Sequence, residues 1–310
     1  PMAPRTLVVV NPRSRSGATR RRFASLEPRL RDCLGGFEVE WTRAPRDAER
    51  IAREGVRAGI ERIVVAGGDG TTSEVVSGLL GAELGSYAEV APLPLGTGGD
   101  MLRTLEVPRQ LDRALEGIAA GSSRKVDAGR VRYTDRDGCQ RTVHFLNVTS
   151  FGVSGLITEL VNRATKALGG RVSFLLGTLR GIARYQPEQV RIRVHGELVH
   201  DGPLVLGTAA NGRFFGGGMQ VAPRAEPADG LFDVVVIPGF SKARLLRELP
   251  RIYRGTHLAV PEVSFHRGQQ IEADAAPGRV WVEIDGEPLG TLPASIEVLP
   301  AAVSVLGPPR

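Results

Sequence analysis

The first 126 residues alternate short β-prone runs with helical stretches. Four of these runs are predicted to be strands, namely Leu7 to Val10, Phe37 to Trp41, Arg62 to Ala66 and Val90 to Leu95. Apolar residues from Val75 to Leu80 have the i, i+4 spacing of an amphipathic helix, and Thr71 with Glu74 predicts a capping box at its start. The alternation predicts a mostly parallel sheet with helices on its faces, in which ligands bind at the carboxyl ends of the strands.

After Val126 the pattern changes to many short β-prone runs. These runs are Thr142 to Phe151, Gln189 to Val194, Pro203 to Ala210, Leu231 to Ile237 and Val280 to Ile284. They predict an antiparallel, sandwich-like β domain, interrupted by helices at about residues 155–185 and 241–254. We therefore expect two domains, an α/β domain over 1–126 and an all-β domain with a few helices over 127–310, the last residues being free to return to the first domain.

The helical stretch within 155–185 leaves two interpretations of its surface. The stretch carries Leu175, Leu176 and Leu179 beside Arg171, Arg180 and Arg184. An apolar face edged with arginine can lie on a membrane. Such a helix more often packs on its own sheet, and packing is the arrangement that we expect here.

The composition is that of a globular protein, with 42% hydrophobic and 24% charged residues in a chain of 310. No apolar run reaches the ~18 residues that span a bilayer, and the start of the sequence lacks the apolar region of a signal peptide. We therefore expect a soluble, cytoplasmic protein. The net charge of +6 favours anionic partners, but charge alone does not distinguish nucleotide phosphates, an anionic membrane and nucleic acid.

A glycine-rich turn, Gly67-Gly68-Asp69-Gly70-Thr71, connects a predicted buried strand to a predicted helix. Glycine lets the backbone approach an anion closely, and the amino end of a helix offers N–H groups to a phosphate. An aspartate in such a turn would repel phosphate unless a divalent cation lies between them, which makes Asp69 a candidate Mg²⁺ ligand. A tight turn with a capping aspartate explains the same residues equally well when the turn is considered alone.

A second turn of similar composition, Gly96-Thr97-Gly98-Gly99-Asp100, follows the next predicted strand. Neighbouring strand ends would bring both turns to one crevice, where Asp69 and Asp100 are candidates to share a magnesium ion. The first strand ends in a polar loop that begins at Asn11 and suits a nucleotide. The sequence contains no GxxxxGK[ST], no GxGxxG after a strand, no HExxH and no plausible GxSxG elbow, so P-loop, Rossmann, zinc-enzyme and hydrolase interpretations fail.

Six segments, in this order, resemble the diacylglycerol kinase catalytic-domain family, which includes bacterial soluble lipid kinases and the sphingosine and ceramide kinases. The segments are Asn11-Pro12, Gly67 to Thr71, Leu95 to Asp100, Asn211 to Gly218, Asp229 to Asp233 and Ile284 to Glu287. The resemblance implies an ATP-binding domain, a β-sandwich domain for the lipid, and transfer of the γ-phosphate to a lipid hydroxyl in the cleft between them. It implies diacylglycerol as the acceptor, ATP and Mg²⁺ as cofactors, peripheral association with an anionic membrane, and no nucleic acid; a homodimer is left open.

The resemblance also assigns roles to individual residues. It places contacts with ATP on Thr42, Gly67, Gly68, Asp69, Gly70, Thr71, Thr72, Ser73 and Thr97. The polar loop after the first strand and the second glycine-rich turn add Asn11 and Gly96 to the candidate nucleotide contacts. Asp69 and Asp100 would serve the catalytic magnesium, and Glu287 would accept the proton of the acceptor hydroxyl. We expect Asp285 to point the same way as Glu287 along one strand, because alternate side chains share a face. From the residues alone, an exposed hairpin is the preferred interpretation, because Asp285-Gly286 is a common turn sequence.

A structural cation is also implied by the resemblance, held by the Asp229 carboxylate and the main-chain carbonyls of Glu226 and Leu231. Two positions depart from the family pattern, since Gly99 and Ser73 stand where relatives usually have asparagine. Three functions stay open: a kinase of diacylglycerol or another lipid alcohol such as a sphingoid base or phosphatidylglycerol, a kinase of a soluble acceptor, and a catalytically impaired nucleotide- or lipid-binding protein.

Overall fold

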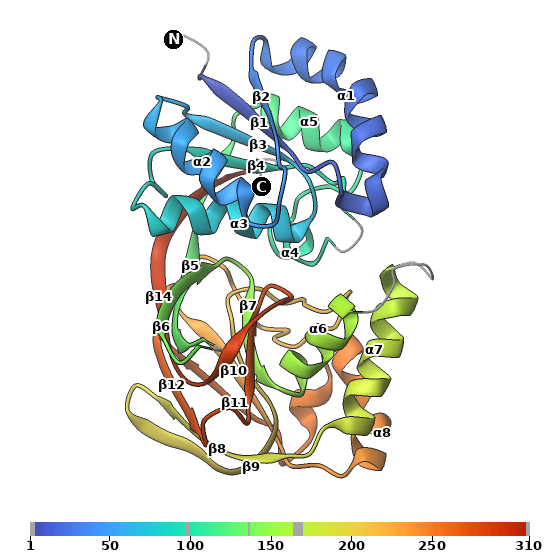
Figure 1. Cartoon of the computed structure of the whole chain (residues 1–310), viewed down its shortest axis with the longest axis vertical. Coiled ribbons are helices and arrows are strands. Elements are labelled where there is room, and N and C mark those ends of the chain that lie inside the picture. Colours follow the sequence, from blue (N-terminus) through green and yellow to red (C-terminus); the bar gives the residue numbers. More distant parts are fainter. Residues whose placement is uncertain (1–3, 97–98, 136, 164–169, 308–310) are drawn as a thin grey trace. The chain divides into compact units, whose positions relative to one another are not determined.

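The computed structural model describes residues 4–96, 99–135, 137–163 and 170–307, which fold into two compact units (Figure 1). The first unit comprises Pro1–Asp127 and Ala301–Arg310, and the second comprises Ala128–Pro300. The chain therefore leaves the first unit once and comes back to it at its carboxyl end.

The first unit is built on a parallel sheet. Its strands are β1 (Thr6–Val10), β2 (Glu38–Trp41), β3 (Arg62–Ala66), β4 (Glu89–Pro92) and the end of β14 (Glu287–Leu306). The order is β14-β4-β3-β1-β2, and every neighbouring pair is parallel. All four predicted strands are confirmed, although β4 ends at Pro92 and the chain turns at Pro94 and Leu95 rather than continuing as a strand.

Helices cover this sheet. They are η1 (Ser14–Gly17), α1 (Ala18–Leu34), α2 (Asp47–Arg57), α3 (Asp69–Gly81), α4 (Asp100–Thr104) and α5 (Leu111–Ala119). The predicted capping box at Thr71 and Glu74 is wrong, because α3 already begins at Asp69 with Gly68 as its N-cap residue. The Glu74 carboxylate instead accepts the backbone N–H of Ala48 at 3.2 Å, so it links α3 to the start of α2.

The second unit is antiparallel. Its strands are β5 (Ser123–Thr134), which begins in the first unit, β6 (Gln140–Phe145), β7 (Val148–Gly152), β8 (Glu188–Val194), β9 (Glu197–Ala210), β10 (Phe232–Pro238), β11 (Ser264–Gly268), β12 (Gln270–Ala275), β13 (Trp281–Ile284) and most of β14. In the part of the chain that is described, six strands pair in the order β8-β9-β7-β13-β14-β12, and β12 pairs back with β8. The predicted sandwich-like domain is therefore closed into a barrel. The predicted single run from 142 to 151 is wrong, since it is broken between Phe145 and Val148.

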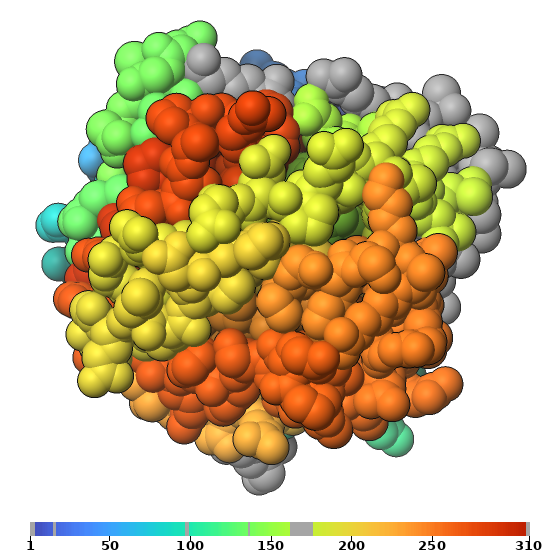
Figure 2. Space-filling model, turned by 90° about the horizontal axis from the view of Figure 1, so that it is seen from below, coloured from blue at the N-terminus to red at the C-terminus, as the bar shows by residue number. Residues whose placement is uncertain are grey.

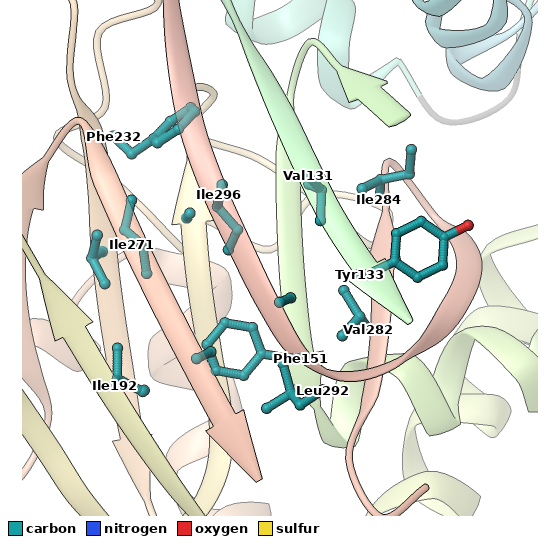
Figure 3. Close-up of a cluster of buried hydrophobic side chains, with 14 of the residues drawn as sticks. Val131, Tyr133, Phe151, Ile192, Phe232, Ile271, Val282, Ile284, Leu292 and Ile296 are labelled. Carbon is teal, nitrogen blue, oxygen red and sulfur yellow. The ribbon is translucent and has the colours of Figure 1, made fainter. Parts of the chain in front are cut away.

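The barrel unit has a large apolar core, part of which Figure 3 shows. The rings of Phe145 and Phe232 stack with their centroids 5.5 Å apart. Gly129 makes room for the first of these rings, because a Cβ there would lie 1.9 Å from Phe145 Cε1. Burial of this alternating set of side chains is the main stabilising contribution to the barrel.

The described part of the barrel unit has three α-helices, namely α6 (Val153–Arg163), α7 (Gly170–Arg184) and α8 (Lys242–Arg254). The short η3 (His257–Ala259) follows α8. Gly177 and Gly181 of α7 face α6 so closely that an added Cβ would lie 2.3 and 2.4 Å from its side chains. We expected this helix to pack on its own sheet, but the face of α7 with these glycines packs on α6. Leu176 and Leu179 on its other face are 37% and 40% exposed, and the side chains of Arg171 and Leu175 lie outside the described part of the chain. Among the described residues, no helix is both long and apolar enough to cross a membrane.

Candidate active site

The carboxyl ends of the parallel strands bring the predicted nucleotide residues together in the first unit. Asn11 follows β1, and its side-chain Nδ2 donates to Thr71 Oγ1 at 2.9 Å, in the turn that follows β3. The backbone N–H of Asn11 also donates to the Ala66 carbonyl at 3.1 Å. Thr42 lies at the end of β2, where its N–H donates to the Val10 carbonyl at 2.9 Å. Three of the predicted nucleotide-contacting residues, Asn11, Thr42 and Thr71, therefore lie at one edge of the sheet.

The two glycine-rich turns are packed directly against each other. A Cβ added at Gly96 would lie 2.6 Å from the Gly68 Cα, which is too close for any side chain at that position. Gly67 has a related constraint, because a Cβ there would lie 2.5 Å from Thr71 Oγ1. By contrast, an added Cβ at Gly70 would meet no atom within 4 Å. Glycine is required at Gly67 and Gly96 for the assembly of the turns, before any ligand is considered.

The two aspartates of these turns are in contact. Asp69 Oδ2 accepts the backbone N–H of Asp100 at 2.9 Å, so the first turn fixes the start of α4. The Asp100 side chain is 8% exposed and its Oδ1 lies 3.5 Å from Arg103 Nη1. Mg²⁺ in phosphoryl-transfer sites is held by one or two carboxylates plus phosphate oxygens and water. Asp69 and Asp100 supply donors of that kind, whereas no group of three or more metal-ligating side chains occurs in the described residues.

The remaining predicted ATP contacts differ in their exposure. Thr72 and Ser73 lie in the first turn of α3 and are only 4% and 7% exposed, and Thr72 Oγ1 lies 3.4 Å from the Gly68 carbonyl. Gly70 is partly exposed at the start of the same helix. Thr97 lies outside the described residues. Gly68, Asp69 and Gly70 are thus more accessible than Thr72 and Ser73, which follow them along α3.

The predicted catalytic pair of the second unit does not lie on one strand. Asp285 and Gly286 form a two-residue turn with φ angles of 47° and 87°, and Ile284 on β13 pairs across it with Glu287 on β14. Both positive φ angles are those of the hairpin turns that favour Asp-Gly. The expectation that Asp285 and Glu287 share a strand face is therefore wrong, and the hairpin interpretation is correct. Glu287 is exposed at the start of β14.

The Asp285 carboxylate holds the backbone of a distant segment. It accepts N–H groups from Leu146 at 3.3 Å, Asn147 at 3.2 Å and Val148 at 2.9 Å. These residues form the break between β6 and β7, so the aspartate stabilises the interruption that the hydrophobic pattern did not predict. A carboxylate with this number of backbone donors is strongly fixed in place.

Asn147 and Asn211, for which the sequence suggested no individual role, extend this set of hydrogen bonds. The Asn147 carbonyl accepts the backbone N–H groups of Asn211 and Gly212, each at 2.9 Å, and its Nδ2 donates to the Phe214 carbonyl at 2.8 Å. Asn211 Nδ2 donates in turn to the Leu146 carbonyl at 2.8 Å. Asn211 and Gly212 belong to one of the segments that resemble the family, and that resemblance was the sequence signal that could have identified them as functional residues. Two separate segments of the barrel unit, 146–148 and 211–214, are thereby tied to the Asp285–Glu287 turn.

A buried glutamate lies directly behind the turn. Glu283 is 2% exposed, its Oε1 contacts Ser150 Oγ, and its Oε2 accepts the backbone N–H of Gly286 at 2.9 Å. Ser150 Oγ is also 2.9 Å from Ser154 Oγ on α6. Burial raises the pKa of the Glu283 carboxyl from its ordinary value of 4.5 to about 7.

The residues predicted for a structural cation lie on the loop before β10. Asp229 Oδ1 accepts the backbone N–H of Leu231 at 3.0 Å, and Asp229 Oδ2 is paired with the guanidinium of Arg267. Glu226 is exposed and Leu231 is partly exposed on the same loop. The Asp229 carboxylate is thus engaged by groups of the protein itself.

Comparisons with known proteins agree with this architecture. Residues 5–131 match the family model described as diacylglycerol kinase catalytic domain, and residues 147–307 match the YegS C-terminal NAD kinase beta sandwich-like domain. The chain is 31% identical to a diacylglycerol kinase of Mycobacterium tuberculosis (strain ATCC 25618 / H37Rv), with 84% of this chain and 82% of the relative covered. It is also 31% identical to the "Probable lipid kinase YegS" of Salmonella arizonae, with 99% and 97% covered.

Solved structures show the same fold. A diacylglycerol kinase structure from Bacillus anthracis str. Sterne superposes with a TM-score of 0.78 at 23% identity, covering 99% of this chain and 98% of that one. Yeast NADH kinase, solved in complex with NADH, superposes with a TM-score of 0.58 at 12% identity, covering 99% and 84%. The α/β unit and the barrel unit together define an NAD kinase-like fold. Within that class, the chain belongs to the diacylglycerol kinase and YegS family of lipid kinases.

Proposed function

We propose that this protein transfers the γ-phosphate of ATP to the hydroxyl of diacylglycerol, giving phosphatidic acid and ADP. The observation that carries the proposal is the contact between Asp69 and Asp100, which joins two glycine-rich turns at the carboxyl edge of a parallel sheet. Two carboxylates and glycine turns at such an edge suit a magnesium–nucleotide complex. Diacylglycerol is proposed as the acceptor because the Mycobacterium tuberculosis relative is named for it.

In the first unit, the turn from Gly68 to Gly70 would bind the phosphates of ATP, with Asn11 orienting Thr71 beside them. Asp69 and Asp100 would hold Mg²⁺, which when bound neutralises charge on the phosphate oxygens. The backbone can approach the phosphates closely because no side chain projects from these glycines. These residues therefore bind and orient the phosphate donor.

In the second unit, we propose that Glu287 takes the proton of the acceptor hydroxyl. The hydroxyl oxygen forms a new bond to the γ-phosphorus while the bond from that phosphorus to the β,γ-bridging oxygen breaks, and ADP leaves with the bonding electrons. Glu287 is suited to this role by its exposure at the start of β14. Asp285, held by three backbone N–H groups, fixes the turn that carries Glu287 and acts as a positioning residue.

We further propose that the protein reaches its lipid at an anionic membrane surface. Leu176 and Leu179 on the outer face of α7 are 37% and 40% exposed, and Arg180 and Arg184 lie exposed beside them. Lys242 at the start of α8 donates to the Ala183 carbonyl, so α7 and α8 border each other, as the yellow-green and orange surfaces of Figure 2 show. Exposed leucines edged by arginine favour binding to a negatively charged bilayer surface.

The proposed reaction is tested with radiolabelled ATP, Mg²⁺ and vesicles that contain diacylglycerol, a sphingoid base or phosphatidylglycerol. We expect labelled phosphatidic acid as the main product, and its loss in Asp69→Ala and in Glu287→Ala by at least ~10³-fold. Asp32→Ala and Glu272→Ala remove exposed carboxylates from α1 and β12, and these matched controls should retain wild-type rates. Labelling of a different lipid, of a soluble acceptor or of nothing would refute diacylglycerol as the acceptor, and wild-type rates in either active-site variant would refute the assigned roles.

The membrane proposal is tested separately by sedimentation with phosphatidylglycerol vesicles. Leu176→Ser with Leu179→Ser should reduce the bound fraction several-fold. Leu198→Ser is the control, because this leucine is 56% exposed on β9 and is not part of the α7 face. Equal losses in the control and in the α7 variant would refute a specific role for α7.

A further inference from the structure

The family resemblance implies a cation at Asp229, on the loop that precedes β10. In the structure this carboxylate is paired with an arginine side chain instead. Asp229 has two carboxylate oxygens, and both are engaged: Oδ1 by the backbone N–H of Leu231 at 3.0 Å and Oδ2 by the guanidinium of Arg267. The Asp229 side chain is 22% exposed and that of Arg267 is 41% exposed. A metal ion at this carboxylate would have to displace the guanidinium or share the oxygen with it.

Arg267 is held in place by the pairing of two strands. In the antiparallel register of β10 and β11, Asp233 and Arg267 lie directly opposite each other. Arg267 Nε donates to Asp233 Oδ1 at 3.1 Å, and the Asp233 side chain is 1% exposed. One guanidinium therefore bridges a buried carboxylate on β10 and the carboxylate of the loop, with the fork geometry that arginine provides and lysine does not.

A second side chain from the same region supports the loop. Gln269, which follows β11, donates from Nε2 to the Gly230 carbonyl at 3.2 Å. Gly230 has a φ of 75°, a conformation that glycine adopts without strain. Arg267 and Gln269 thus hold the loop at the Asp229 carboxylate and at the Gly230 carbonyl. Neither contact needs an ion.

We propose that the guanidinium of Arg267 takes the place of the structural cation at Asp229, so that this loop is ordered without a divalent metal. The guanidinium already pairs with one oxygen of each of the two carboxylates that would otherwise attract a cation, and its positive charge repels a second one. The residues implied by the resemblance do not fit a metal here, because the carboxylate ligand is occupied. The inference is independent of the acceptor lipid and of the proposed catalytic role of magnesium.

The test uses the full chain with Asp69→Ala, which removes one of the two ligands of the proposed catalytic magnesium, and Asp229→Asn then identifies any ion that is bound at the loop. After dialysis against Ca²⁺ or Mg²⁺, elemental analysis should find well below one ion per chain. The thermal unfolding midpoint should be the same in EDTA and in millimolar Ca²⁺ or Mg²⁺. An ion bound one-to-one, and lost on Asp229→Asn, would overturn the proposal.

The second arm adds Arg267→Ala to the same background. We expect the midpoint in EDTA to fall by roughly 5 °C, because Asp233 loses its partner, and Ca²⁺ or Mg²⁺ to restore most of that loss. The matched control is Arg244→Ala, which breaks a 2.7 Å ion pair with Glu262 and should not respond to either cation. A lowered midpoint that no cation restores would refute the equivalence of guanidinium and metal. If Arg267→Ala does not fold, the metal content of the Asp69→Ala protein decides the question.

Discussion

Replacing Glu283 by glutamine should make the protein more stable at neutral and alkaline pH. The buried carboxyl of Glu283 accepts the Gly286 N–H at 2.9 Å and contacts Ser150 Oγ, which lies 2.9 Å from Ser154 Oγ. Protonated Glu283 can donate to Ser150, which then donates to Ser154, and every group is satisfied. A glutamine reproduces this arrangement, because its oxygen can accept from Gly286 and its NH₂ group can donate to Ser150.

The magnitude follows from the pKa of this group. Burial raises the pKa of Glu283 from 4.5 to about 7, a difference that corresponds to about 3 kcal/mol. Below pH 4.5 the carboxyl is protonated in both the folded and the unfolded chain, so it contributes no pH dependence. Between pH 4.5 and 7 only the unfolded chain ionises, so stability falls as pH rises, and the full loss persists above pH 7. The glutamine variant has no such loss.

The assay is the thermal midpoint of the wild type and of Glu283→Gln at several values between pH 4.5 and 8.5. The two midpoints should be nearly equal at pH 4.5, and the variant should unfold roughly 6 to 12 °C higher at pH 8, if the whole difference acts on the barrel unit. Glu272→Gln makes the same chemical change on an exposed position of β12 and should follow the wild type throughout. A gap between Glu283→Gln and the wild type that stays constant with pH would refute the buried, protonated carboxyl.

Three further predictions concern the turns. Gly96→Ala places a Cβ 2.6 Å from the Gly68 Cα. We therefore expect the free energy of unfolding to fall by about 1–3 kcal/mol in denaturant titrations and kinase activity to fall strongly. The control is Gly70→Ala, whose added Cβ meets open space and should leave stability unchanged. Gly99 has a φ of 74°, which asparagine tolerates and alanine does not. Gly99→Asn should therefore keep the denaturant midpoint and, by restoring the side-chain amide that relatives usually have here, raise turnover severalfold, whereas Gly99→Ala should lose about 1–2 kcal/mol of stability. Unchanged turnover in Gly99→Asn would show that the missing amide does not limit catalysis. Asp285→Asn should cost about 1–3 kcal/mol in the same titration, because an amide cannot accept three N–H groups with both of its terminal atoms, and an unchanged midpoint would contradict the positioning role.

The first unit was predictable because its signals are local. The strand from Arg62 to Ala66 has the bounds that its apolar run predicts. Parallel strands place their carboxyl ends at one edge, so the meeting of Asn11 with Thr71 and of Asp69 with Asp100 follows from topology once the strands are assigned. The capping box failed for a similar local reason, since the helix begins two residues before Thr71 and leaves Glu74 to a tertiary contact with α2.

The second unit was less predictable because its decisive contacts are non-local. The strand that hydrophobicity predicts from 142 to 151 is broken where the Asp285 carboxylate takes up three backbone N–H groups about 140 residues away in sequence. The register that sets Arg267 opposite Asp233 is likewise invisible in either segment alone. Closure of the barrel depends on the pairing of β12 with β8, which no local pattern specifies.

The acidic residues of the β13–β14 hairpin differ in what they hold, and this difference decides their roles. Glu283 is buried and supports Gly286 from behind, while Asp285 is fixed by the backbone of Leu146 to Val148. Both carboxylates are therefore committed to the geometry of the turn, and Glu287 is the member of the set that is exposed at the start of a strand. A proton acceptor must be able to meet its substrate while its backbone is rigidly held. The Asp-Gly turn, which as a sequence pattern argued for an ordinary hairpin, is for this reason compatible with a catalytic role for the residue that follows it.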